Sequence, residues 1–481
     1  MAYLLIGFPL LMAAACFACP WDRWRPWLLP LGALAQLAMV FAVVFPAPGA
    51  AGVSGLNDWL LLDAPGKVVL AVVSVQFFLC SLYAPGYLAL RRDRPNRVFC
   101  ANCFCTLAMM TLVTLAHHLG LMWVAVEATT LVSAPLLYFN RNARSLEATW
   151  KYLLISSVGI ALALFGSFFL AYSSLAVGLE STLLFEQLVA DAGRLSSPWL
   201  HAAFVLLLIG YGTKMGLAPM HTWKPDAYGE APGLVGALMA GGVTSCAFLA
   251  ILRIYRICQA GAAAEFSREM MVVVGLLSMA VAAIFMARQR DLKRLLAYSS
   301  VEHMGVLVLG VGIGGLAVYG ALLHVINNAL AKGALFLSAG NLHRAFGSKF
   351  TDSVRGALGV APVSAAVFAA GFLAITGSPP FGPFVSELTI INAAMGDGRF
   401  LLVAAFLALL AIVFIGMGST VLAVVQGEPG PEAGQTGFCD RFNTSVPIVL
   451  FLALLLGIGI YVPAPVESLL REAAAVLEVR R

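Results

Sequence analysis

The residues FVLLLIGYGTKMGLAPMHTW, numbers 204–223, form a mostly apolar run long enough to cross a membrane, and this run meets Pro219 near its end. A second apolar run, 358–395, contains the motif GSPPFGP, with Pro379 and Pro380 in its middle. Proline removes a backbone donor and breaks a helix. At membrane depth a break is tolerated where the backbone is buried in protein or lines a wet cavity. The two runs therefore predict a polytopic membrane protein with two broken helices.

The composition of the whole chain agrees with this class. Of its 481 residues, 61% are hydrophobic and only 11% are charged. A soluble domain carries about 25% charged residues, so this chain cannot cover a water-facing surface of its own size. A soluble enzyme and a disordered scaffold are both excluded. The net charge of +5 lies in short loops, which indicates membrane topology and no binding of nucleic acid.

About fourteen apolar runs are long enough for a helix that crosses the bilayer, which needs roughly 20 residues. These runs do not alternate in polarity as barrel strands do, so the predicted fold is all-α. The runs are 2–19, 27–46, 67–90, 98–117, 119–139, 151–173, 202–222, 232–255, 269–287, 295–313, 317–340, 358–395, 400–425 and 445–463.

The spacing of the two breaks predicts an internal repeat. Pro219 and Pro379 lie 160 residues apart, which corresponds to about five spans. An odd number of spans inverts the second unit relative to the first, and paired broken helices are typical of inverted-repeat transporters. The expected parts are N-terminal helices in 1–97, a first five-helix repeat in 98–255, an inverted second repeat in 256–425, and a last span with a short tail in 426–481.

Positive charges predict the orientation, because cytoplasmic loops are enriched in Lys and Arg. With the N-terminus outside, the inside loops include RRDRPNR (91–97) and the basic stretch 288–294, whereas the outside loops 47–66 and 174–200 hold few basic residues. The pattern predicts an even number of spans with both termini outside. Three residues are exceptions to it: Arg253, Arg256 and Arg268.

Several ionisable side chains lie inside the apolar runs, where a charge is costly and is usually functional. They are Glu127, Lys214, His324, Lys332 and Glu387. Lys214 precedes the first break and Glu387 follows the second. A structural role stays open for some of them, since Glu127 could fix a helix contact and His324 could be a hydrogen-bonded core histidine. These residues are nevertheless the candidates for an ion path.

Motifs of soluble enzymes are absent from the sequence, which has no phosphate loop, no dinucleotide fingerprint and no HExxH. The cysteine cluster CANCFC (100–105) opens an apolar helix and lacks a fourth thiolate or histidine nearby. Small buried residues explain this cluster better than a metal site does. We therefore expect no metal, no cofactor and no catalytic residue in this chain.

Four motifs resemble a known superfamily. The stretch KMGLAPMHTWKPDAYGEAPG (214–233) resembles the broken-helix motif of the antiporter-like subunits shared by respiratory complex I, Mrp antiporters and membrane-bound hydrogenases. DLKRLLAYSSVEHMG (291–305) is similar to the segment that follows in those proteins. LMWVAVEATTLVSAPLLYF (121–139) and SLEATWKYLLISSVG (145–159) most resemble component F of hydrogenase-4 and related formate hydrogenlyases. The resemblance covers roughly residues 70–425.

The resemblance implies roles for the buried charges. Glu127 is the acid of the fifth span and Lys214 the base of the seventh, and in the family these form a functional pair. His324 and Lys332 match residues that carry protons between half-channels, and Glu387 takes a twelfth-span position held by Lys or Glu. The full candidate set for proton translocation is Glu127, Lys214, His221, His324, Lys332, Glu387, Lys293 and His303.

Simpler roles remain open for two members of this set. Lys293, together with Arg294, could extend its charged end to the inner membrane surface. His221, together with Asp226, could satisfy free backbone groups at the helix break.

The chain departs from the family pattern at two positions. The usual eighth-span lysine would fall near Ser245, and a second eleventh-span histidine is replaced by Asn328. A complete lysine-to-lysine relay would therefore need waters or hydroxyl side chains to fill the gaps.

The resemblance implies a proton-translocating subunit of a redox-driven complex, of the hydrogenase-4 or complex I kind, in a bacterial inner membrane. The expected partners are other membrane subunits and hydrogenase-like or quinone-reactive soluble subunits. An Mrp-type cation/proton antiporter subunit and a membrane subunit of an inorganic carbon uptake system stay open as alternatives. The choice between H⁺ and Na⁺ and the direction of pumping stay open as well.

Overall fold

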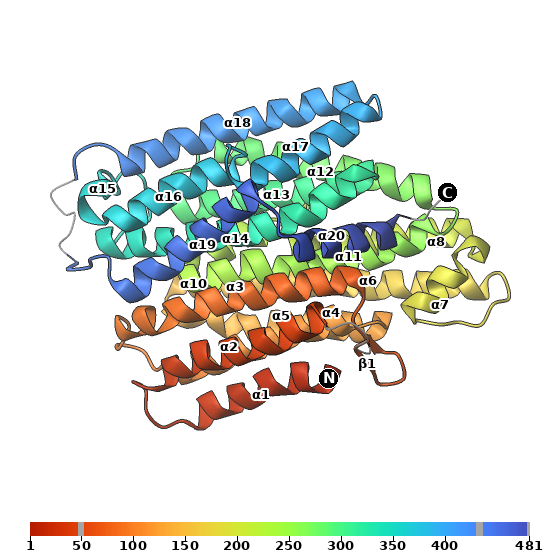
Figure 1. Cartoon of the computed structure of the whole chain (residues 1–481), viewed down its shortest axis with the longest axis horizontal. Helices are drawn as coiled ribbons and strands as arrows, with labels where there is room; N and C mark the ends of the chain where they lie inside the picture. Colours follow the sequence, from red (N-terminus) through yellow and green to blue (C-terminus); the bar gives the residue numbers. More distant parts are fainter. Residues whose placement is uncertain (47–51, 430–435, 479–481) are drawn as a thin grey trace.

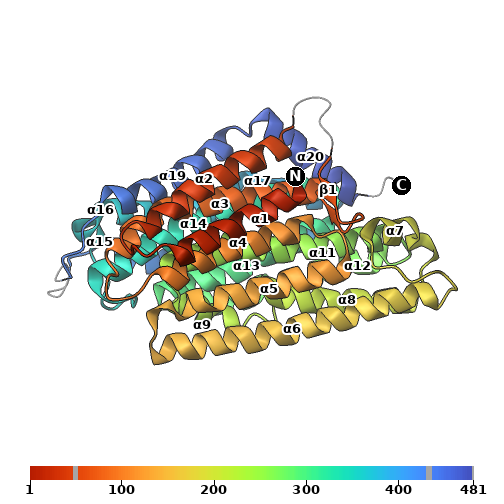
Figure 2. The ribbon, with the colours of Figure 1, turned by 90° about the horizontal axis from the view of Figure 1, so that it is seen from below.

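The computed structural model describes residues 1–46, 52–429 and 436–478, and these are almost entirely helical. The long helices lie side by side along one direction and form a bundle (Figure 1), as a second view also shows (Figure 2). The helices are α1 (Ala2–Ala18), α2 (Arg25–Val44), α3 (Ala64–Ala89), α4 (Arg97–Leu115), α5 (Leu119–Leu137), α6 (Ala143–Leu175), α7 (Phe185–Ala190), α8 (Ser197–Met215), α9 (Trp223–Glu230), α10 (Gly233–Leu238), α11 (Thr244–Gln259), α12 (Ala264–Met286), α13 (Leu292–Ile313), α14 (Leu316–Phe346), α15 (Ala357–Val360), α16 (Pro362–Ile375), α17 (Gly382–Gly396), α18 (Phe400–Val425), α19 (Phe442–Ile460) and α20 (Ala464–Leu477).

Shorter elements complete the described chain. Two strands, β1 (Ser54–Gly55) and β2 (Leu60–Leu61), pair antiparallel in the loop before α3. A π-helical turn, η3 (Met239–Val243), joins α10 to α11 within one continuous span. Two single 3₁₀ turns are η1 (Tyr138–Asn140) and η2 (Ala192–Arg194).

Each apolar run that we expected to cross the membrane is helical, and the all-α polytopic fold is confirmed. By length and composition, 11 of the described helical stretches can cross a membrane, while α1 and α16 are apolar but shorter. The number fourteen and the division of the chain at residues 97, 255 and 425 therefore stay predictions.

The largest difference from an expected boundary is at α6, which begins at Ala143 and not near 151. Asn142 caps it, because its side chain accepts a hydrogen bond from Ser145 N at 2.7 Å while Ser145 Oγ accepts one from Asn142 N at 3.0 Å. This reciprocal pair satisfies two backbone donors that a helix start leaves free. The added turns are polar, so hydropathy alone could not include them.

Both proline breaks interrupt helices in the structure. After α8 the chain turns at Gly216, with φ +85°, and after α16 it turns at Gly377, with φ +70°. Such left-handed backbone favours glycine because a side chain is strained there. In each predicted repeat the interrupted helix is the fourth, counting α4, α5, α6 and α8, and then α12, α13, α14 and α16–α17.

The most buried helices lie in the middle of the bundle. α13, α14 and the span from α10 to α11 are almost completely buried, whereas only 28% of the apolar stretch of α18, and the same share of α19, is buried. The outer helices are apolar on the exposed side, as a lipid-facing surface requires. The start of α1 and the end of α20 lie at the same end of the bundle (Figure 1). This arrangement agrees with an even number of crossings.

The arginines that break the predicted charge pattern have polar partners. The buried Arg253 guanidinium donates to Asp63 at 2.7 and 3.2 Å, and Arg256 pairs with Glu186 at 2.8 Å. Arg253 also donates to the carbonyl oxygens of Val113, Thr114 and Ala116. This one side chain therefore connects the ends of α11 and α4 to the start of α3.

We expect Asp63→Asn to destabilise the protein by about 3–5 kcal/mol, because it leaves the Arg253 charge buried without its carboxylate. Thermal denaturation of the detergent-solubilised protein measures the loss. The matched control is Asp58→Asn, in the same loop, because the Asp58 side chain is exposed. Equal stability of the two variants would show that the Asp63–Arg253 pair does not hold this end of the bundle.

The same pair predicts a pH dependence of stability. Burial opposes ionisation of Asp63, but the Arg253 charge and its hydrogen bonds outweigh burial and hold the pKa of Asp63 below its usual value. A lowered folded-state pKa stabilises the fold fully above the unfolded-state pKa, near 4, and less as the pH falls through the folded-state pKa. The stability difference between the parent and Asp63→Asn should therefore be constant above about pH 5 and shrink below pH 4.

Candidate functional site

Glu127 on α5 and Lys214 on α8 are joined through a hydroxyl group. Lys214 Nζ donates to Thr130 Oγ1 at 2.7 Å, and Thr130 Oγ1 lies 3.2 Å from Glu127 Oε2. No direct ion pair between the two residues is recorded in the described part of the chain, although the resemblance implies a functional pair. Thr130 Oγ1 can accept a hydrogen bond from the Lys214 ammonium while its own O–H donates one to the Glu127 carboxylate. The pair is thus a bridged unit.

The surroundings of this unit differ at its two ends. Lys214 is buried, and its Nζ also donates to Tyr152 OH on α6 at 2.6 Å. Glu127 is half-buried and accepts a hydrogen bond at 2.8 Å from Ser157, an exposed residue of α6. The lysine end therefore lies in the interior and the carboxylate end faces the periphery.

A second chain of buried groups runs through α13, α14 and α17. His303 Nδ1 lies 3.0 Å from His324 Nε2, and His324 Nδ1 lies 2.9 Å from Ser386 Oγ. Glu387 follows Ser386 and is also buried. Gly377, in the second helix break, makes room for its carboxylate, since a Cβ there would lie 2.2 Å from Glu387 Oε2. The second break thus holds Glu387 beside two histidines.

Lys332 lies two turns along α14 from His324. Its Nζ donates to Ser299 Oγ on α13 at 2.6 Å, and Glu302 follows Ser299 by three residues on the same side of α13. Glu302 Oε2 is 3.0 Å from His303 Nε2, without the alignment of a hydrogen bond. Both Glu302 and Lys332 are fully buried. Glu302 therefore links the lysine to the histidine chain.

His303, His324 and Glu387 could also offer three ligand atoms to a metal, all within 4.8 Å of one another. The two histidine nitrogens that face each other are at hydrogen-bond distance, so one donates and the other accepts. This arrangement suits the transfer of a proton between the rings.

The two remaining candidates lie apart from these chains. His221 Nδ1 is 3.2 Å from the carbonyl oxygen of Pro219, and its ring packs near Phe285 and Tyr298. Lys293 is buried, and its Nζ donates to Ala231 O at 2.9 Å. The alternative in which Lys293 reaches the membrane surface is therefore wrong. For His221 the contact with the broken backbone agrees with the simpler structural role.

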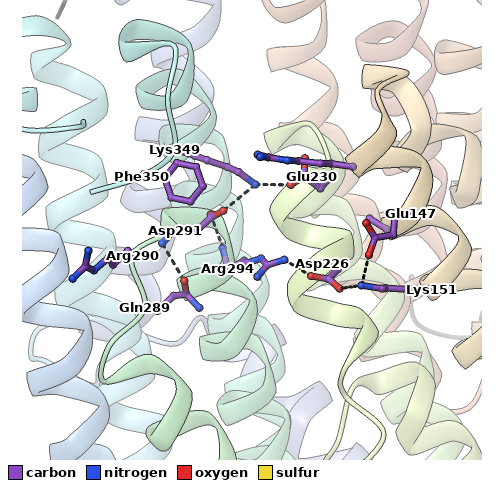
Figure 3. Close-up of a pocket in the computed structure, with 12 residues that line it drawn as sticks. Glu147, Lys151, Asp226, Glu230, Gln289, Arg290, Asp291, Arg294, Lys349 and Phe350 are labelled. Atoms are coloured by element: carbon purple, nitrogen blue, oxygen red, sulfur yellow. Dashed lines mark hydrogen bonds and ion pairs between the residues drawn. The ribbon is translucent and has the colours of Figure 1, made fainter. Parts of the chain in front are cut away.

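A polar cavity of about 320 Å³ is lined by residues of α6, α9 and the start of α13 and by Lys349 and Phe350 (Figure 3). Lys151 joins Glu147 at 2.6 Å to Asp226 at 2.9 Å, and Asp226 also pairs with Arg294. On the other side, the Lys349 ammonium lies 2.8 Å from Glu230 and 2.9 Å from Asp291. Asp226 therefore binds basic side chains, and the interpretation that it satisfies free backbone groups is wrong.

The sequence interpretation missed buried polar residues that the fold brings into these chains. Glu302 lies inside the apolar run 295–313, so the rule that selected Glu127 could have found it. Lys224 lies in the broken-helix motif 214–233 but between two apolar runs, and no sequence signal shows that it is buried. The hydroxyl partners are Thr130, Tyr152, Ser299 and Ser386.

A helical bundle with two broken helices and ionisable groups buried beside them defines the class of antiporter-like membrane proteins. Residues 116–413 match the family described as NADH:quinone oxidoreductase/Mrp antiporter, TM. The chain belongs to this family, so the resemblance seen in its motifs is confirmed. It is a multi-pass membrane protein and an antiporter-like subunit of the kind found in complex I and group 4 hydrogenases.

Individual relatives agree with this family. The chain is 32% identical over 432 residues to a hydrogenase-4 component F homolog of Methylacidiphilum infernorum (isolate V4), which covers 88% of this chain and 89% of the relative. It is 30% identical over 401 residues to NADH-quinone oxidoreductase subunit N of Desulforudis audaxviator (strain MP104C), with 81% and 79% covered. A chain of the archaeal membrane-bound sulfane sulfur reductase shares its fold, with TM-score 0.87, 20% identity, and 99% and 97% covered.

Proposed function

We propose that this chain translocates protons across a bacterial inner membrane as a subunit of a redox-driven membrane complex. The observation that carries the proposal is two series of ionisable groups with hydroxyl partners, one from Glu127 to Lys214 and one from Lys332 to Glu387. Charges buried in a membrane protein are costly and mark ion paths. Relatives named hydrogenase-4 component F homolog and NADH-quinone oxidoreductase subunit N support a redox-driven host complex with further membrane subunits.

The first half of the path stores a proton at Lys214. A nearby carboxylate favours the charged lysine, whereas burial favours the neutral amine. A change in the position or charge of Glu127 therefore loads or unloads Lys214 through Thr130. Because Glu127 is half-buried and bonds the exposed Ser157, a neighbouring subunit packed on α6 could drive this change.

The second half passes the proton from Lys332 towards Glu387. Glu302, His303 and His324 lie between them, and each imidazole can accept a proton on one nitrogen and release one from the other. A carboxylate oxygen of Glu387 on α17 lies within 4.8 Å of ring nitrogens of both His303 and His324. The carboxylate of Glu387 is the release group of this half.

The transported ion is tested by acidification of membrane vesicles that contain the complete host complex and its electron donor. We expect uptake of protons in sodium-free buffer and collapse of the pH gradient by a protonophore, because lysine, histidine and carboxylate chains conduct protons. Vesicles from cells that lack this chain are the control. A strict requirement for Na⁺ would contradict the proposal and favour the Mrp-type cation/proton antiporter, which the family description includes.

The expected membrane orientation is tested by reporter fusions. Fusions after Arg97 and after Arg355 should report the cytoplasm, because basic residues gather in these loops. A fusion at the start of α3, after Asp63, is the matched control and should report the outside. A reversed pattern at all three positions would invert the orientation, and disagreement between Arg97 and Arg355 would contradict the number of spans between them.

A further inference from the structure

We propose that Lys224 is the proton carrier that connects the two halves of the path, in place of the eighth-span lysine that this chain lacks. The inference rests on the proposed proton translocation and adds a residue to it. Lys224 belongs to α9, the short helix that follows the first break, and α9 lies against α13 and α6 inside the bundle. A residue that hydropathy places in a loop is thus part of the interior.

Lys224 has the surroundings of a proton-carrying lysine. Its side chain is completely buried, and its Nζ lies 5.7 Å from the centre of the Tyr228 ring. Within the described residues, no carboxylate forms an ion pair with it. A buried ammonium without a counter-charge is unstable, so the neutral amine is accessible and the group can both take up and release a proton.

On one side Lys224 adjoins the first half of the path. Its Nζ donates to the carbonyl oxygen of Met215 at 2.8 Å, and Met215 follows Lys214 directly. The close approach depends on Gly216, because a Cβ at that position would lie 2.8 Å from Lys224 Nζ. The helix break therefore brings the Lys224 amine to the end of α8, one residue after Lys214.

On the other side Lys224 adjoins the second half. Its Nζ lies 3.5 Å from the carbonyl oxygen of Ser300, and the preceding residue, Ser299, accepts a hydrogen bond from Lys332 at 2.6 Å. The two amines therefore contact successive residues of α13. Two like charges at close range disfavour each other, so a proton on one lysine favours the neutral form of the other. This coupling suits the transfer of one proton at a time from Lys224 to Lys332.

The eighth span itself offers no substitute. Ser245 is buried, and its hydroxyl already donates to the carbonyl oxygen of Gly241 at 2.6 Å. A serine hydroxyl does not ionise at neutral pH, so Ser245 cannot hold a transferable charge as a lysine does. Lys224 therefore supplies the titratable group that α11 lacks.

The proposed step moves one proton. The Lys214 ammonium becomes a neutral amine as the Lys224 amine becomes an ammonium, and the same exchange from Lys224 to Lys332 restores Lys224. Ser300 Oγ and Tyr228 OH flank Lys224, and the described residues give neither a hydrogen-bond partner. Buried hydroxyls of this kind bind water, and bound water can conduct the proton between the amines.

The test measures proton uptake by vesicles that contain the complete complex with Lys224→Gln, Lys224→Arg or the control Lys67→Gln. Glutamine keeps a donor for Met215 O but no titratable group, and arginine keeps the charge and the donors but does not release its proton. We expect both Lys224 variants to lose uptake at least about tenfold at normal abundance in the membrane, since a missing proton carrier typically costs that much or more. Lys67, at the start of α3 and outside the path, should be replaceable without effect.

Uptake near the parent level in Lys224→Arg would overturn the inference, because a fixed positive charge would then suffice. If this larger side chain does not accumulate in membranes, Lys224→Gln decides alone, and normal uptake by it would overturn the inference. Lys214→Met, measured in the same vesicles, separates the two proposals. If Lys214→Met loses uptake while Lys224→Gln keeps it, only the role of Lys224 is contradicted. Normal uptake in Lys214→Met would contradict the proposed function itself.

Discussion

Lys214→Met should lose coupled proton uptake at least about tenfold, and Glu127→Gln should lose it to a similar degree. Methionine cannot hold a proton, so the storage site disappears. Glutamine removes the carboxylate that favours the charged lysine, and a buried lysine without that influence stays neutral. The two substitutions disable the same unit from its two ends.

The double variant distinguishes one unit from two paths. If Glu127 and Lys214 act together through Thr130, the double variant should be no worse than either single variant, because groups that act as a unit are strongly non-additive. Coupled turnover and proton uptake in vesicles, with matched expression of the three variants, measure this. Losses that multiply would instead assign the residues to separate paths.

Thr130 offers a matched pair of variants for the bridge between them. Thr130→Ser keeps the hydroxyl that accepts from Lys214, whereas Thr130→Val removes it with little change of volume. Uptake should therefore persist in the serine variant and fall in the valine variant. Equal activity of the two would show that the hydroxyl is not the link.

The sequence was sufficient for the class, for the two breaks and for the ionisable side chains inside the apolar runs that we listed (Glu127, Lys214, His324, Lys332 and Glu387), because each rests on a local signal. A charge in an apolar run and a proline in a helix can be recognised without the fold. The bridging role of Thr130 could not be predicted, since threonines are common in membrane helices and only packing decides which hydroxyl meets Lys214. The same holds for Tyr152, which comes from a third helix.

Lys224 shows a different limit of sequence interpretation. It lies in WKPDAYGE, a polar stretch between two apolar runs, and this composition is typical of a surface loop. The stretch is buried because the first break turns α9 back against α13, which hydropathy cannot represent. By contrast, Asp226 and Glu230 on the same short helix face the polar cavity (Figure 3). The two sides of α9 thus differ in environment although the sequence looks uniformly polar.

Glu387→Gln is expected to block proton release, with a loss of uptake of at least about tenfold and no loss of assembled protein. The carboxylate is buried beside Gly377, and its Oε1 has no hydrogen-bond partner among the described residues. Glutamine has nearly the same shape as glutamate and fills the same space. The loss of the carboxylate also removes few hydrogen bonds, so the fold should tolerate the change. Glutamine cannot accept the proton that arrives through the histidine pair, so the second half of the path should stop at its last step.

The measurements for Glu387→Gln are proton uptake, redox turnover and the amount of the chain in purified membranes. The control is Glu467→Gln, on the exposed face of α20, which should leave all three unchanged. Glu387→Asp should recover part of the uptake, because it keeps an acid that is one methylene shorter, whereas a role in packing would make the shorter aspartate more harmful than glutamine. Loss of the folded chain from membranes in Glu387→Gln would assign this carboxylate to structure. Normal uptake in that variant would move the release group away from α17 and leave the histidine pair without an acceptor there.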